Sequence, residues 1–167
     1  MGDHMHTVLT VGPLTETQKR ALPEVMADFL NYQGVEFDPE PLPDDPDRIR
    51  ITLGDVNYGI GTLGKGNGAI EELMEANMPY RLTDDGGSFH NGTDVIWHPD
   101  FRDLPPLTRQ ANSEGTVVIS EALISKLAAL DDAALGKTIR GLVKTDPSEP
   151  ELVDAYKFVT SYLSKVL

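Results

Sequence analysis

The segment from Asp38 to Asp47 places four prolines in ten residues, and it limits the folds open to this chain more than any other stretch. Proline fixes φ and lacks an N–H group, so such a segment can form neither a helix nor a central strand. We therefore expect an extended acidic connector. Residues 48–53 then alternate strictly between polar and apolar side chains, which predicts a strand with one buried and one solvated face.

Strand-like and helix-like patterns alternate on both sides of this connector. Residues 6–11 predict a strand, and Thr15 with Gln18 forms a capping box that opens a helix running towards Gly34, with Pro23 inside its pattern. A short helix is expected at 69–77, and strands at 80–83 and 93–97. This order predicts an α+β fold in which helices lie on one face of a mixed sheet, within an acidic domain spanning residues 5–100.

The remainder of the chain has a different pattern. Residues 101–115 contain Pro105-Pro106 and little periodicity, and we interpret them as a linker. Residues 116–167 predict a small C-terminal bundle of three helices, at 121–130, 132–144 and 149–166. The last of these carries an apolar stripe from Leu152 to Val166 that the other helices or another chain must cover. Self-association through these helices is therefore one hypothesis.

The charge is distributed unevenly between these two parts. The net charge is −13, and residues 1–115 hold 20 acids and 8 bases, whereas residues 116–167 hold 7 acids and 6 bases. A surface of this kind repels nucleic acid and attracts basic partners, although a solvated face that aids solubility has the same composition. The carboxylates expected to form a partner-binding surface lie in and around the proline-rich segment: Glu36, Asp38, Glu40, Asp44, Asp45 and Asp47.

The glycine-rich loop from Gly59 to Gly68 matches two phosphate-binding patterns in part. Gly59, Gly61 and Gly64 have the G-x-G-x-x-G spacing, and Lys65 completes G-x-x-x-x-G-K. The Walker pattern requires Ser or Thr at the next position, where this chain has Gly66, and the dinucleotide pattern requires a helix sooner than Ala69. The alternatives are thus a plain surface loop and a small nucleotide- or phosphate-binding enzyme that uses this loop.

Other catalytic or metal-binding patterns are weaker. His90 and His98 are the candidate metal ligands of an Asp- and His-containing stretch, but Asp94 and His98 lie about 13 Å apart along a strand and cannot readily share an ion. Ser88, Ser113 and Ser120 lack the surroundings of a catalytic nucleophile. We predict no catalytic residue, no metal and no cofactor, and basic patches with interleaved aromatic residues are absent from the N-terminal part.

The C-terminal ~45 residues carry a resemblance to a known family. The run from Leu127 to Lys137, with Ile139, Leu142 and the segment Asp154 to Val159, is similar to a small helical module of phage and prophage proteins. That module resembles the N-terminal part of phage replisome organisers. The resemblance implies a phage or mobile-element origin and carries over no catalytic residue.

The sequence also gives expectations about the cellular compartment and about the N-terminal residues. The chain has no cysteine, no basic segment leading into an apolar one and no apolar run of about 20 residues, so we expect a cytoplasmic protein without membrane association. Residues 1–4 have the appearance of a cloning remnant ahead of Met5. The combined hypothesis is a non-enzymatic interaction protein of phage or mobile-element type. Its acidic domain would engage a basic, nucleic-acid-binding protein.

Overall fold

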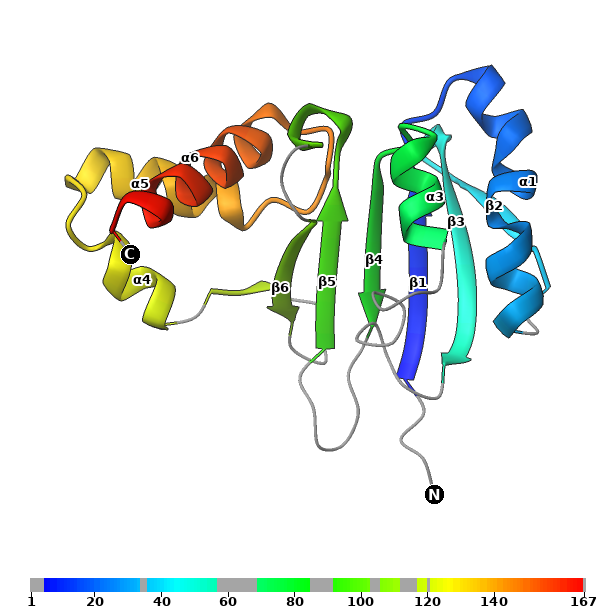
Figure 1. Ribbon diagram of the computed structural model, residues 1–167, viewed down its shortest axis with the longest axis horizontal. Helices are drawn as coiled ribbons and strands as arrows, with labels where there is room; N and C mark the ends of the chain where they lie inside the picture. The colour runs from blue at the N-terminus through cyan, green and yellow to red at the C-terminus, as the bar shows by residue number, and fades with distance from the viewer. Residues whose placement is uncertain are drawn as a thin grey trace.

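A seven-stranded sheet forms the centre of the protein, and helices pack against it (Figure 1). The computed structural model describes residues 5–33, 36–56, 69–84, 92–102, 106–111, 117–119 and 121–166. Its strands are β1 (Met5–Val11), β2 (Pro39–Leu42), β3 (Asp45–Val56), β4 (Tyr80–Asp84), β5 (Gly92–Trp97), β6 (Leu107–Ala111) and β7 (Val117–Val118). The helices are α1 (Glu16–Gln33), α3 (Ala69–Glu75), the 3-10 turn η1 (Pro99–Phe101), α4 (Glu121–Leu127), α5 (Asp132–Leu142) and α6 (Pro150–Val166).

The spatial order of the strands is β2-β3-β1-β4-β5-β6-β7, and every neighbouring pair is antiparallel. The α+β class with C-terminal helices is confirmed. The sheet is antiparallel rather than mixed because β2 and β3 form a hairpin after α1, and the hairpin returns β3 antiparallel to β1. Gly12 directly follows β1, and its φ of +126° favours glycine. A Cβ at this position would lie 2.6 Å from the Asp47 carbonyl oxygen.

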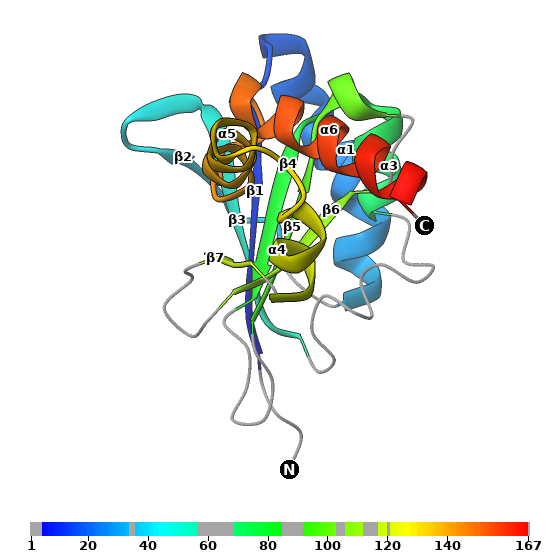
Figure 2. The same cartoon turned by 90° about the vertical axis from the view of Figure 1, so that its left-hand side faces the viewer.

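Helices α1 and α3 lie on the same side of the sheet, as the views in Figures 1 and 2 agree. The capping box at the start of α1 is confirmed: the Thr15 N–H donates to Gln18 Oε1 at 3.0 Å, and the Gln18 N–H donates to Thr15 Oγ1 at 3.3 Å. Pro23 lies inside one continuous helix. The buried alternation predicted for residues 48–53 is confirmed, since Ile49, Ile51 and Leu53 face the core.

The range predicted as a linker contains part of the sheet. Residues Leu107–Ala111 form β6, which pairs with β5 over its whole length, so the linker prediction is wrong for these residues. The sheet therefore continues past the expected domain boundary. The helices that follow are attached to its far edge through β7.

Strand β5 is buried on both faces, because Asp94 and Ile96 alternate with Val95 and Trp97 and all four are buried. The C-terminal segment covers the Asp94 face, where Arg109 donates to the backbone oxygens of Leu142 and Lys144. Trp97 is a core residue and stacks on Tyr80 with ring centroids 6.2 Å apart.

The apolar stripe on α6 is covered within the chain. Leu152 and Tyr156 join the main core, whereas Val159 joins a second cluster with Leu127 and Leu142. Helices α5 and α6 approach closely at Gly141, where an added Cβ would lie 2.6 Å from the Cβ of Ala155. Cover for this part of the stripe comes from the sheet and the neighbouring helices, so it does not require a second copy of the chain.

Candidate functional site

The six acidic residues singled out from the sequence lie on and beside the β2–β3 hairpin, at one edge of the sheet. Five of the six are exposed and one, Asp45, is half-buried: Glu36, Asp38, Glu40, Asp44, Asp45 and Asp47. Figure 2 shows the turn of this hairpin projecting from the sheet on the side away from α1 and α3. The structure thus places the predicted residues along one edge of the sheet, from the segment before β2 to the first residues of β3.

Two of these carboxylates are paired within the chain. Asp45 Oδ2 accepts from Arg48 Nε at 2.7 Å, and Asp47 Oδ1 accepts from Lys19 Nζ at 2.7 Å. The hydrogen bond that Lys19 donates to Asp47, with a second that it donates to Glu16, raises the pKa of the Lys19 ammonium. The backbone oxygen of Asp47 also accepts from the Leu14 N–H at 2.7 Å. The contacts of Asp47 with Lys19 and Leu14 join the start of β3 to the N-terminal end of α1.

The other four carboxylates, Glu36, Asp38, Glu40 and Asp44, have no ion-pair partner among the described residues. We call these four residues the acidic edge. They lie around β2, which is the terminal strand of the sheet. Their charges are therefore available to a binding partner.

Strand β2 is poorly suited to pairing with a further strand. Pro39 and Pro41 occupy two of its four positions and have no N–H to donate. Proline at an edge is one of the devices by which proteins prevent edge-to-edge association. A partner at this edge would therefore contact side chains and would not extend the sheet.

Arg48 links the hairpin to the C-terminal segment. Its Nη2 donates to Asp146 Oδ2 at 2.6 Å and to Ser148 Oγ at 3.0 Å, across a sequence separation of 98 residues for the first pair. Burial raises the pKa of Asp146, but the hydrogen bonds from Arg48 and Ser148 outweigh it and leave the pKa below its ordinary value. This contact joins the turn between α5 and α6 to the first residues of β3.

A buried ionic cluster lies on the Asp94 face of the sheet, and sequence reasoning missed it. Asp94 is fully buried; its Oδ1 accepts from Arg81 Nε at 2.8 Å and its Oδ2 accepts from Arg109 Nη2. The register places Asp94 beside Arg109 on the neighbouring strand. Burial lowers the pKa of Arg109, and the charge of Asp94 opposes that effect. The signal that could have found the cluster is a charged residue at Asp94, within the otherwise apolar pattern of a central strand.

This cluster changes the interpretation of the proposed metal ligands. Asp94 is occupied by two arginines, and His98 Nδ1 accepts from the backbone N–H of Asp100 at 3.1 Å. His90 lies outside the described residues. Within the described ranges, no group of three or more His, Cys, Asp or Glu side chains could hold a metal ion.

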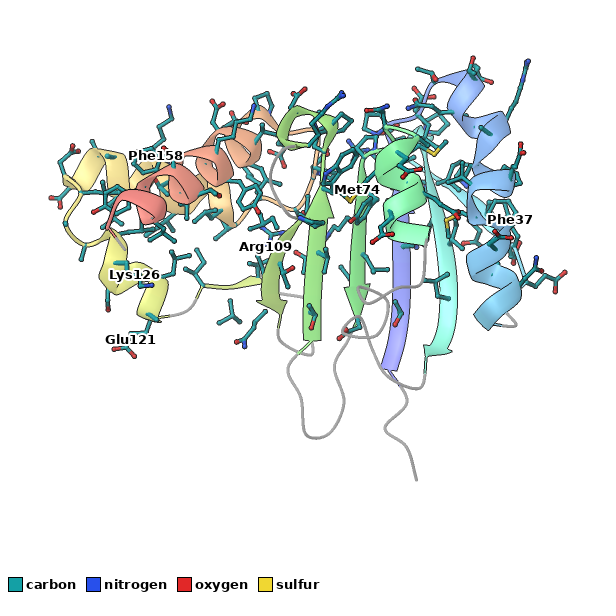
Figure 3. All side chains as sticks on the ribbon, in the orientation of Figure 1. Phe37, Met74, Arg109, Glu121, Lys126 and Phe158 are labelled. Atoms are coloured by element: carbon teal, nitrogen blue, oxygen red, sulfur yellow. The ribbon has the colours of Figure 1, made fainter. Side chains whose placement is uncertain are left out.

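Two hollows lie among the C-terminal helices and the last strands of the sheet. One, of about 250 Å³, lies between β6, β7, α4 and α5 and has Arg109 in its wall. The other, of about 240 Å³, lies between α5 and α6 beside Phe158 (Figure 3). The glycine-rich loop predicted as a ligand site, with Gly59, Gly61, Gly64 and Lys65, lies outside the described residues.

Comparison with known proteins adds no relative. No family model, no curated protein and no solved structure matches this chain. The resemblance of the C-terminal helices to phage proteins therefore stays a prediction. Among the described residues, no helix is long and apolar enough to cross a membrane.

Proposed function

We propose that this protein is a non-enzymatic interaction module whose acidic edge binds a basic protein partner. The observation that carries the proposal is the set of four exposed carboxylates, Glu36, Asp38, Glu40 and Asp44, which form no ion pair among the described residues, although Arg50 lies opposite Glu40 on β3. They sit on and beside a hairpin that the Lys19–Asp47 ion pair joins to α1. The acidic edge thus lies on a hairpin whose position is fixed by a contact within the chain.

The charge of the chain supports a role in association. An excess of acids over bases in residues 1–115 creates a negative field that accelerates encounter with cations. Such a field acts mainly on association rate and choice of partner, and salt screens it within about 8 Å at physiological ionic strength. The same field disfavours nucleic acid, so the partner would be a basic protein, including one that itself binds nucleic acid. The phage or mobile-element setting rests on the resemblance of the C-terminal helices alone.

A fluorescent lysine-rich peptide is a suitable probe, and two quadruple variants make a matched pair. The edge variant carries Glu36→Gln, Asp38→Asn, Glu40→Gln and Asp44→Asn. The control variant carries Glu24→Gln, Asp28→Asn, Glu75→Gln and Asp154→Asn, which neutralises four exposed carboxylates elsewhere. Both sets change the net charge by the same amount and by the same chemistry.

We expect the edge variant to bind the peptide about tenfold more weakly than the control variant at low salt, and the difference to vanish as salt is added. Equal losses in both variants would show that only the overall charge matters, and would overturn the proposal. Binding that does not respond to salt would overturn it as well.

A further inference from the structure

The hollow beside β6 is built differently from the surrounding surface. It lies at the edge of the sheet opposite the acidic edge, where two strands and two helices meet. Its apolar walls are formed by Leu107, Val118, Ile119, Leu123 and Leu142. Strand β7 pairs only with Gln110 and Ala111, so among the described strands the outer edge of β6 has no partner from Leu107 to Arg109. The result is an apolar cavity of about 250 Å³ at an incompletely covered edge.

Arg109 introduces a cation into this apolar wall, and Figure 3 shows it between β6 and the C-terminal helices. Its side chain is 6% exposed. Nη1 donates to the oxygens of Leu142 and Lys144, both at 2.5 Å, and Nη2 donates to Asp94. Nε is buried and has no hydrogen-bond partner among the described residues. A buried donor without a partner is costly and unusual in a native protein.

The charges around Arg109 do not cancel. Among the described residues, Arg81 and Arg109 share the one carboxylate of Asp94; Arg109 is 6% exposed and Arg81 is 26% exposed, so one positive charge is in excess and Arg81 meets solvent in part. The backbone carbonyls of Leu142, at the end of α5, and of Lys144, just beyond it, offset part of this charge through their dipoles. A buried cation is normally balanced by an anion, so within the described part of the chain the cluster is one negative charge short.

We propose that this cavity binds a small apolar monocarboxylate, with its hydrocarbon part against Leu123 and Ile119 and its carboxylate directed to Arg109. One carboxylate would supply the missing charge and an acceptor for the spare donors of the guanidinium. The remaining walls offer apolar contact, which is the usual composition of a ligand site with few polar groups. At roughly 30 Å³ per water-sized group, the volume suits on the order of eight to ten non-hydrogen atoms.

The size and polarity of the site select this ligand class against others. A nucleotide or other polyphosphate carries several charges, whereas the cluster lacks only one. An uncharged hydrocarbon would fill the cavity, but it would neither balance the positive charge nor accept a hydrogen bond from Arg109 Nε. A purely structural clamp between β6 and the end of α5 is the competing role for Arg109, and it predicts no preference for carboxylates.

Titration with octanoate and with 1-octanol separates these possibilities, because the two molecules share a chain and differ in the head group. The full-length protein would be followed by calorimetry and by backbone amide shifts. We expect saturable binding of octanoate, at least about tenfold tighter than octanol, with shifts confined to β6, β7 and α4. Octanol binding as tightly as octanoate, or no saturable octanoate binding, would overturn the proposal.

Two variants of α4 test the location without altering Arg109. Leu123→Trp places a large side chain in the cavity wall, whereas Ile124→Trp makes the same change at the neighbouring, exposed position. Leu123→Trp should abolish octanoate binding and Ile124→Trp should leave it intact. If Leu123→Trp does not fold, Arg109→Lys serves instead: it keeps the charge, loses the fork of donors and should weaken octanoate more than octanol. Unchanged octanoate binding in both Leu123→Trp and Arg109→Lys would place the ligand elsewhere.

Discussion

The close approach of α5 and α6 at Gly141 gives a sharp prediction about how the C-terminal helices hold together. A Cβ at this position would lie 2.6 Å from the Cβ of Ala155 and would also collide with the Glu151 backbone oxygen. Carbon atoms in contact normally lie roughly 3.5–4.0 Å apart, so Gly141→Ala requires the helices to separate by about 1 Å. The collision involves the backbone of α6, which cannot rotate away.

The magnitude follows from two opposing effects. Overpacking a close contact costs about 1–3 kcal/mol, whereas replacing glycine by alanine within a helix recovers roughly 0.5–1 kcal/mol. We therefore expect Gly141→Ala to lower the free energy of unfolding by about 1–2 kcal/mol. Gly136 on the same helix is the matched control, since a Cβ there meets only the flexible Arg140 side chain, with Nη1 at 3.2 Å. Gly136→Ala should be neutral or stabilising by up to about 1 kcal/mol.

Urea unfolding followed by circular dichroism measures both variants. Opposite shifts of the midpoint with an unchanged denaturant slope would report opposite changes in stability. If Gly141→Ala stabilises the protein as much as Gly136→Ala does, the two helices are not in close contact at Gly141. The described packing of α6 would then be wrong.

Three further predictions concern charged groups. Asp94→Asn removes the one carboxylate that the described residues place in the buried cluster, and it should cost roughly 3–5 kcal/mol in urea unfolding. Asp100→Asn, at an exposed position, should change stability by less than about 0.5 kcal/mol. A cost for Asp94→Asn as small as that would show that the cluster is not buried. The pKa of Asp146 is lowered in the folded state, so its contribution to stability is present above its unfolded pKa and is lost as the pH falls. Thermal melts from pH 7 to pH 3 should therefore show a shallower decline below about pH 5 in Asp146→Asn than in the wild type, and identical slopes would contradict the ion pair with Arg48. For the glycine-rich loop, thermal-shift screening with ATP, GTP and NAD, with and without Mg²⁺, should show no ligand-specific rise in melting temperature; a rise that disappears in Lys65→Ala would establish the nucleotide-binding alternative.

The sequence predicted those strands and helix ends that neighbouring residues determine. Alternation at Ile49, Ile51 and Leu53 identified β3, and the pair Thr15 and Gln18 placed the start of α1. Asp131 caps α5, as its sequence position indicates, by accepting from two backbone N–H groups at 2.9 and 3.0 Å. In each case, residues close to one another in the sequence determine where the strand or helix lies.

Elements that depend on distant residues were missed. Strand β6 has one buried apolar residue, Leu107, and follows two prolines, so its sequence resembles a linker; pairing with β5 makes it a strand. Its other buried side chain is Arg109, which is acceptable there only because Asp94 lies on the adjacent strand. The direction of β3 also depends on a distant contact, since β2 is too rich in proline to be recognised as half of a hairpin.

The acidic edge was predicted only in outline. Composition identified six carboxylates as one surface, but it could not show that Asp45 and Asp47 are paired with Arg48 and Lys19. Lys19 is 28 residues from Asp47, and that ion pair forms only because the hairpin folds back against α1. The surface available to a partner is thus smaller than the sequence indicates.

Locating a basic peptide on the folded protein tests the central claim most directly. Backbone amide spectra of the full-length chain would be recorded at low salt during titration with a lysine-rich peptide. We predict that the perturbed amides concentrate at residues 36–44 and that added salt reverses the changes. Perturbations spread equally over the other acidic surfaces, such as those of α1 and α6, would contradict a dedicated binding edge.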